Sequence, residues 1–261
     1  MIDHIHLDHI AVAMEDRRAG RERYAAELGG ARVGGGEDPG FWSEQVRYAN
    51  GMKVEILEPL NIEKNDFLRR FLDRNGPGAH HLTFKVADIV AALAEVESAG
   101  YRPVSVNIDN PAWREAFLHP KDAPGVVVQL AQSDESGDWG EPLPEGYPAV
   151  TVAPATLVRI THAVASLDDG LRLFRDLLAG EELGRDADEA GRWVDLGWHG
   201  PESEGRIRVV QPSSPSSPLA AWIGDRRGRV HHIAFSVAGE SGRREVTPED
   251  NLGVRLLLEG E

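Results

Sequence analysis

The stretch that decides the fold is His80-His81-Leu82-Thr83-Phe84-Lys85-Val86, because it recurs as His231-His232-Ile233-Ala234-Phe235-Ser236-Val237. A second pair of related stretches is Leu7–Ala13, which contains His9, and Ile160–Ala165, which contains His162. His81 and His232 are 151 positions apart, and His9 and His162 are 153 apart. Two matches at nearly one offset indicate an internal duplication. We therefore predict two homologous domains, residues 1–131 and 157–261.

Residues 132–156 lie between the two predicted domains. They are rich in proline, glycine and acidic residues and show no apolar period, which is typical of a linker.

Each predicted domain divides again into smaller units. A strand that carries His9 leads into a helix over 16–28, and two strands follow around 44–49 and 52–57. The pattern restarts at His81, with a helix that Asp88 caps and strands at 112–118 and 126–131. The first domain therefore has the order strand, helix, strand, strand, twice. The fourth such unit is eroded, since 239–244 replaces its helix.

Four polar residues are expected on one face of the sheet, because successive side chains of a strand point to opposite faces. Each of the four strands has one such polar residue between apolar residues, and the apolar residues are expected to face the covering helices. This leaves His9, Glu55, His81 and Gln129 on the other face.

Two imidazoles, one carboxylate and one amide oxygen suit a divalent metal such as Zn, Ni, Co, Mn or Fe. Taken singly, a histidine in a half-buried strand is more often structural. The prediction rests on the four coincident placements and on the repeat. The second domain has His162, Arg208, His232 and Leu257 at the positions we take as equivalent. Since arginine stays protonated and leucine has no lone pair, we expect this half to have lost any metal.

Composition limits the other classes of function. The chain has 261 residues, a net charge of −15 and no cysteine. The negative charge disfavours nucleic acid and anionic membrane surfaces as partners. Without cysteine there is no disulfide, thiolate ligand or thiol nucleophile. No apolar window has the length of a membrane span and the N-terminus lacks a signal-peptide pattern, so we expect a cytoplasmic protein.

The motifs resemble the vicinal oxygen chelate superfamily, which includes glyoxalases, extradiol dioxygenases, methylmalonyl-CoA epimerase and bleomycin-resistance proteins. The similarity covers most of residues 7–131, where the first domain is most similar to the epimerase. It rests on 8–13, 55–60, 78–86, and 117–121 leading to 125–130. The resemblance implies an α+β fold of tandem domains built from paired βαβββ modules, with curved mixed sheets enclosing a cleft and helices outside. It also implies that each of the units described above contains one further strand that the sequence pattern does not reveal.

The resemblance further implies that His9, Glu55, His81 and Gln129 are the metal ligands. The epimerase pattern usually has Glu where this chain has Gln129, and that Glu takes part in proton transfer. Since an amide cannot accept that proton, the base is expected to be Glu55 first and Glu44 second. Phe41, Trp42, Tyr48 and Trp113 are candidates to line the pocket, although for each an ordinary core position is favoured.

The function expected is an enzyme: a metal-dependent isomerase or epimerase that stabilises an enediolate of a small carbonyl or acyl-thioester substrate. Two alternatives remain open. One is a metal-dependent lyase or dioxygenase of the same superfamily. The other is a metal-free protein that binds a small molecule, as bleomycin-resistance proteins do. A homodimer is compatible with each.

Overall fold

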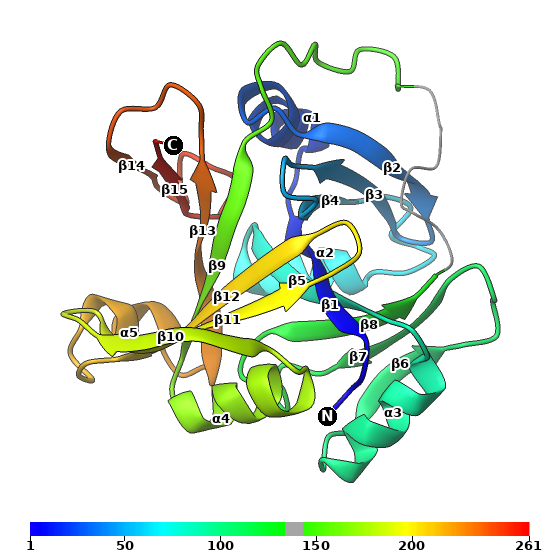
Figure 1. Cartoon of the computed structure of the whole chain (residues 1–261). Coiled ribbons are helices and arrows are strands. Elements are labelled where there is room, and N and C mark those ends of the chain that lie inside the picture. The colour runs from blue at the N-terminus through cyan, green and yellow to red at the C-terminus, as the bar shows by residue number, and fades with distance from the viewer. Residues whose placement is uncertain (134–142, 261) are drawn as a thin grey trace. The chain divides into compact units, whose positions relative to one another are not determined.

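The computed structural model describes residues 1–133 and 143–260. The first sheet has eight strands in the order β2-β3-β4-β1-β5-β8-β7-β6 (Figure 1). Their bounds are β1 Ile5–Ala13, β2 Ala31–Asp38, β3 Phe41–Arg47, β4 Lys53–Pro59, β5 Gly78–Val86, β6 Pro103–Asn107, β7 Arg114–Leu118 and β8 Val127–Gln132. β1 pairs with β4, and β5 with β8, in parallel. The outer strands pair antiparallel.

The strands and helices of this sheet form two βαβββ modules. The first is β1, a helix, β2, β3 and β4, and the second is β5, a helix, β6, β7 and β8. The predicted α+β fold of paired modules is confirmed. The two strands that the sequence pattern did not reveal are β2 and β6. β2 contains three consecutive glycines at 34–36, which hide the alternation of apolar and polar residues.

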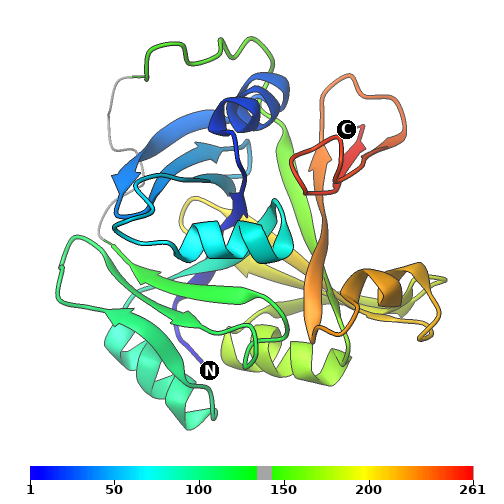
Figure 2. The ribbon, with the colours of Figure 1, turned by 180° about the vertical axis from the view of Figure 1, so that it is seen from behind.

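The helices of these modules begin within one residue of the starts that the sequence predicts. α1 (Arg17–Arg21) has Asp16 as its N-cap and continues as the π-helical segment η1 (Glu22–Glu27). α3 (Ile89–Ser98) begins at Asp88, whose carboxylate accepts from two backbone N–H groups. α2 (Phe67–Asn75) lies between the modules in sequence. Figure 2 shows α2, in cyan, beside β1. It packs Leu68 and Leu72 on small and apolar residues of β1 and β4.

The second sheet has seven strands in the order β10-β11-β12-β9-β13-β15-β14. Their bounds are β9 Thr156–Val164, β10 Glu181–Ala187, β11 Gly191–His199, β12 Glu204–Pro212, β13 Gly228–Ser236, β14 Arg243–Val246 and β15 Leu256–Glu259. The helices are α4 (Leu167–Leu171), η2 (Arg172–Leu177) and α5 (Pro218–Ile223). As the sequence predicts, no helix lies between β13 and β14, a stretch that the structure describes throughout.

The chain divides into two compact units that alternate along the sequence. One contains 1–8, 81–134 and 159–232, and the other contains 9–80, 135–158 and 233–261. Four of the five boundaries fall inside strands, namely β1, β5, β9 and β13. The domain limits 1–131 and 157–261 stay a prediction.

The proposed linker is described only in part, since 134–142 lie outside the described residues. At its far end, Ala155 donates its backbone N–H to Leu28 and accepts from Ala49. Within the described residues, none of the helices has the length and apolar character needed to cross a membrane.

Candidate metal centre

The predicted ligands of the first module lie on neighbouring parallel strands. In the β1–β4 ladder, Ala11 is the Cα partner of Glu55, so His9 precedes that partner by two residues and faces the same side. The second module repeats the relation. In the β5–β8 ladder, Thr83 is the partner of Gln129, and His81 precedes it by two. The pairing register thus puts Glu55 and Gln129 in equivalent places.

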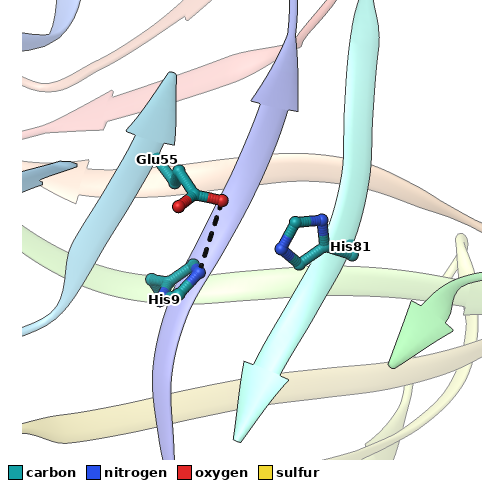
Figure 3. A group of neighbouring side chains, drawn as sticks. All are labelled: His9, Glu55 and His81. Carbon is teal, nitrogen blue, oxygen red and sulfur yellow. Dashed lines mark ion pairs between the residues drawn. The ribbon is translucent and has the colours of Figure 1, made fainter. Parts of the chain in front are cut away.

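Three of the four predicted ligands form a compact group. One potential ligand atom each from His9, Glu55 and His81 lies within 4.8 Å of the other two. The Nε2 atom of His9 and the Oε2 atom of Glu55 are 3.6 Å apart. Figure 3 shows the two imidazoles, from β1 and β5, and the Glu55 carboxylate from β4 turned toward a common space. His9 and His81 are buried and Glu55 is partly exposed, so the group is closed to solvent at the two histidines and more open at Glu55.

The donor set fits a divalent transition metal. Ligand atoms about 2.0–2.2 Å from one ion are roughly 3–4 Å from each other. The 3.6 Å between Nε2 of His9 and Oε2 of Glu55 falls in this range. The ligand atoms of the three residues lie no more than 4.8 Å apart, so only a small movement of the side chains toward a common ion is needed. Imidazole nitrogen with carboxylate oxygen suits several first-row metals. The other oxygen of Glu55, Oε1, accepts from the Nε2 of Gln45 at 3.1 Å, which fixes the carboxylate plane.

Gln129, the fourth predicted ligand, is buried and both ends of its amide are hydrogen-bonded. Its Oε1 accepts from the hydroxyl of Thr83 at 2.6 Å, and its Nε2 donates to Oε2 of Glu115 at 2.7 Å. An amide oxygen has two lone pairs, so the bond from Thr83 leaves one for a metal. The sequence missed Glu115, although it lies two residues from Phe117, the Cα partner of Gln129, and so faces the same side.

Glu44, the second candidate for the base, lies on the opposite face of the sheet. Its Cα partner is Ile56, whereas Glu55 pairs with Gln45. The Glu44 carboxylate is fully buried and accepts from the guanidinium of Arg21 on α1, with contacts of 2.6, 3.0 and 3.2 Å. The expectation that Glu44 moves a proton at the metal is therefore wrong. It holds the helix to the sheet.

The aromatic candidates also divide between the two faces. Phe41 packs edge-on against Phe67, next to the cluster under α2, and Trp113 donates its indole N–H to Glu115 at 2.9 Å. Both lie on the face of the ligands. Trp42 stacks under the guanidinium of Arg17, on the helix side. Tyr48 is buried, and its hydroxyl donates to a backbone carbonyl.

The second sheet corrects two of the equivalences inferred from the repeat, those of His162 and Arg208. In the first sheet, His9 is the Cα partner of Lys53, and Ala11 is the partner of Glu55. In the second sheet, Thr161 is the partner of Arg208, and Ala163 is the partner of Val210. The residue at the place of His9 is therefore Thr161, one position before His162, and the residue at the place of Glu55 is Val210.

His162 instead points toward the helix side and is fully buried against Phe174. Its Nε2 lies 2.7 Å from the carbonyl of Pro124, and burial lowers its pKa to about 4. His232 does occupy the place of His81, with its Nε2 3.1 Å from the hydroxyl of Thr161. This half holds one imidazole where the first half holds two, together with Val210 and Leu257.

Comparison with known proteins agrees with this architecture. The family model described as the Glyoxalase/Bleomycin resistance protein/Dioxygenase superfamily matches residues 8–117. A crystal structure of a hypothetical protein from Staphylococcus aureus, 13% identical, matches 98% of this chain and 100% of its own with a TM-score of 0.64, which shows the tandem fold. The chain belongs to this superfamily, that of the vicinal oxygen chelate proteins.

Its first half is similar to methylmalonyl-CoA epimerases. It is 33% identical over 132 residues to the ethylmalonyl-CoA/methylmalonyl-CoA epimerase of Cereibacter sphaeroides, a match that covers 48% of this chain and 96% of that protein. The mitochondrial methylmalonyl-CoA epimerase of Homo sapiens is 31% identical over 132 residues, covering 49% of this chain and 73% of that one. The crystal structure of methylmalonyl-CoA epimerase from Mycobacterium tuberculosis is 27% identical with a TM-score of 0.45, over 50% of this chain and 89% of its own.

Proposed function

We propose that this chain is a divalent-metal-dependent isomerase or epimerase that acts on a small carbonyl or acyl-thioester substrate. The observation that carries the proposal is the group of His9, Glu55 and His81, whose ligand atoms lie within 4.8 Å of one another on three adjacent strands. The similarity of the first half to epimerases of methylmalonyl-CoA supports an acyl-CoA as the substrate.

The residues of the site divide into a rigid and a reactive part. His9 and His81 are buried on central strands, so their imidazoles are held with little freedom. With Glu55 and the Oε1 atom of Gln129 they would hold the metal. When bound, the metal is a Lewis acid that stabilises negative charge on the substrate's carbonyl oxygen as the neighbouring carbon loses a proton. Positions of the metal without a protein ligand would take water or substrate oxygens.

Glu55 remains as the acceptor of that proton in the proposal. It is the more exposed member of the group, and one of its oxygens faces His9 while the other is held by Gln45. A carboxylate in this place can ligate through one oxygen and take a proton on the other. Gln129 cannot do this, because an amide has no free basic oxygen at neutral pH. Glu44 is not part of the proposal, because it lies on the other face of the sheet.

The test begins with the metal content of the chain purified without chelator or a histidine tag, followed by titration with Zn, Ni, Co, Mn and Fe. We expect about one ion per chain, since the second sheet lacks the ligands. Exchange of the α-proton of methylmalonyl-CoA in heavy water then measures the chemistry. His9→Ala and His81→Ala should abolish both metal retention and exchange. His199→Ala is the matched control, because its side chain is 62% exposed on the second sheet.

Glu55→Gln separates the two roles of Glu55. The variant keeps an oxygen ligand but removes the basic oxygen, so we expect exchange to fall by roughly 10²-fold or more while metal is still bound. Absence of stoichiometric metal under all these conditions would refute a metalloenzyme and favour the metal-free binding protein. Exchange that is as fast in His9→Ala and His81→Ala as in the parent would show that the reaction occurs elsewhere.

A further inference from the structure

The side chain of Gln129 has two different ends, and only one of them can ligate a metal. The amide oxygen has lone pairs, whereas the NH₂ group only donates. Rotation by 180° about the last side-chain bond exchanges the two ends with little change in shape. The site therefore needs something that selects the orientation in which the oxygen faces the ligand group.

Thr83 does not make this selection. Its hydroxyl lies 2.6 Å from Oε1 of Gln129, but a hydroxyl both donates and accepts. It would form an equally good bond with the NH₂ end of a reversed amide.

Glu115 does make the selection. Its ionised carboxylate only accepts, and its Oε2 atom lies 2.7 Å from Nε2 of Gln129. A reversed amide would bring the oxygen of Gln129 against this carboxylate, so that two acceptors would meet. The same Oε2 atom also accepts from the indole N–H of Trp113 at 2.9 Å, which anchors Glu115 in place.

We propose that Glu115 is a positioning residue that fixes the Gln129 amide with its oxygen toward the metal. This inference rests on the proposed metal site. It also gives a reason for an amide at position 129, because a carboxylate there would face Glu115 at hydrogen-bond distance with no proton between them.

The test is a graded series at position 115 in the full chain. The Glu115 carboxylate only accepts hydrogen bonds, the amide of Glu115→Gln can accept or donate them, and the ammonium of Glu115→Lys only donates them. The dissociation constant for Co²⁺ is measured by competition with a chromophoric chelator, and the visible spectrum of bound Co²⁺ reports the ligand set. If Glu115→Gln makes the two orientations equal, the apparent affinity falls about twofold. Glu115→Lys favours the reversed amide, so we expect a loss of tenfold or more and an altered spectrum. The control is Glu97→Lys, on the exposed side of α3, which should change affinity by less than twofold.

The same series in a Gln129→Glu background separates orientation from net charge. With a carboxylate at position 129, Glu115 is the repelling neighbour and a lysine at 115 is the hydrogen-bond donor. The inference therefore predicts that the order of affinities reverses in this background. If Glu115 acted only through its negative charge, the order would be the same in both backgrounds.

Three results have distinct meanings. A parent chain that binds no Co²⁺ refutes the proposed metal site itself. A parent that binds Co²⁺, with Glu115→Lys equal to Glu97→Lys, refutes the role of Glu115 alone. If Glu115→Lys does not fold, the Co²⁺ affinity of Gln129→Glu is compared with that of the double variant Gln129→Glu, Glu115→Gln. Tighter binding with Glu115→Gln supports the inference, and equal or weaker binding overturns it.

Discussion

Replacing Glu44 by glutamine removes the negative charge from a buried ion pair. The side chains of Arg21 and Glu44 are 8% and 0% exposed, and Arg32 adds a second guanidinium with its Nε 3.6 Å from the same carboxylate. The substitution removes the counter-charge that these buried cations face at position 44. Breaking a buried pair in this way costs about 3–5 kcal/mol. For a chain of this size the melting temperature should fall by about 6–20 °C.

Urea unfolding followed by tryptophan fluorescence measures this loss. The control is Glu27→Gln, which breaks the exposed pair with Arg23 and should cost about 0.5 kcal/mol or less. Replacing both partners, with Arg21→Met and Glu44→Leu, should recover part of the stability, because the charge of Arg21 is removed together with its counter-charge while Arg32 remains.

The same variant tests the assignment of faces. Because Glu44 points away from His9 and Glu55, the folded Glu44→Gln chain should keep its metal affinity. A loss of stability below about 1 kcal/mol, or metal affinity reduced more than tenfold in the folded variant, would contradict the reasoning from the register of β3 and β4.

Three other predictions concern buried groups and close contacts. Burial lowers the pKa of His162 to about 4, against about 6.5 in an unfolded chain, so the unfolded state binds more protons between these values. Stability should therefore fall by about 2 kcal/mol from pH 7.5 to pH 5, and urea unfolding of His162→Gln should lack this part of the loss. Metal at 100 times its dissociation constant should stabilise the parent by about 2.7 kcal/mol and raise its melting temperature by about 5–10 °C, whereas His81→Ala should show no shift. Gly125→Ala should not yield folded protein, because φ is +79° and a Cβ would lie 1.9 Å from the carbonyl oxygen of Gly228; a soluble variant with the parent's circular dichroism would contradict this.

Strand alternation was sufficient to place the candidate ligands on one face. His9, Glu55, His81 and Gln129 each lie in strands whose apolar residues fall on alternate positions, and the ladders give all four the predicted side. Alternation also contains the information that separates Glu44 from Glu55. Within β3, Glu44 lies two residues before the buried Val46 and so shares its face, and the hairpin register with Gln45 opposite Glu55 agrees with this.

Two features could not be obtained from pattern alone. Both strands contain Ala-Val-Ala, but this tripeptide begins two residues after His9 and one residue after His162. Aligning the two histidines therefore shifts the tripeptides by one residue, and a shift of one residue exchanges the two faces of a strand. Glu115 was missed because its relation to Gln129 depends on the antiparallel pairing of β7 with β8, which no local motif specifies.

The loss of ligands in the second sheet has an evolutionary consequence. In a symmetric dimer of identical chains, every substitution appears twice, so a valine at a ligand position would remove both sites at once. In a chain that carries both copies, Val210 and Leu257 each appear once and leave Glu55 and Gln129 untouched. In such a chain one half can therefore change at these positions while the other retains its candidate ligands.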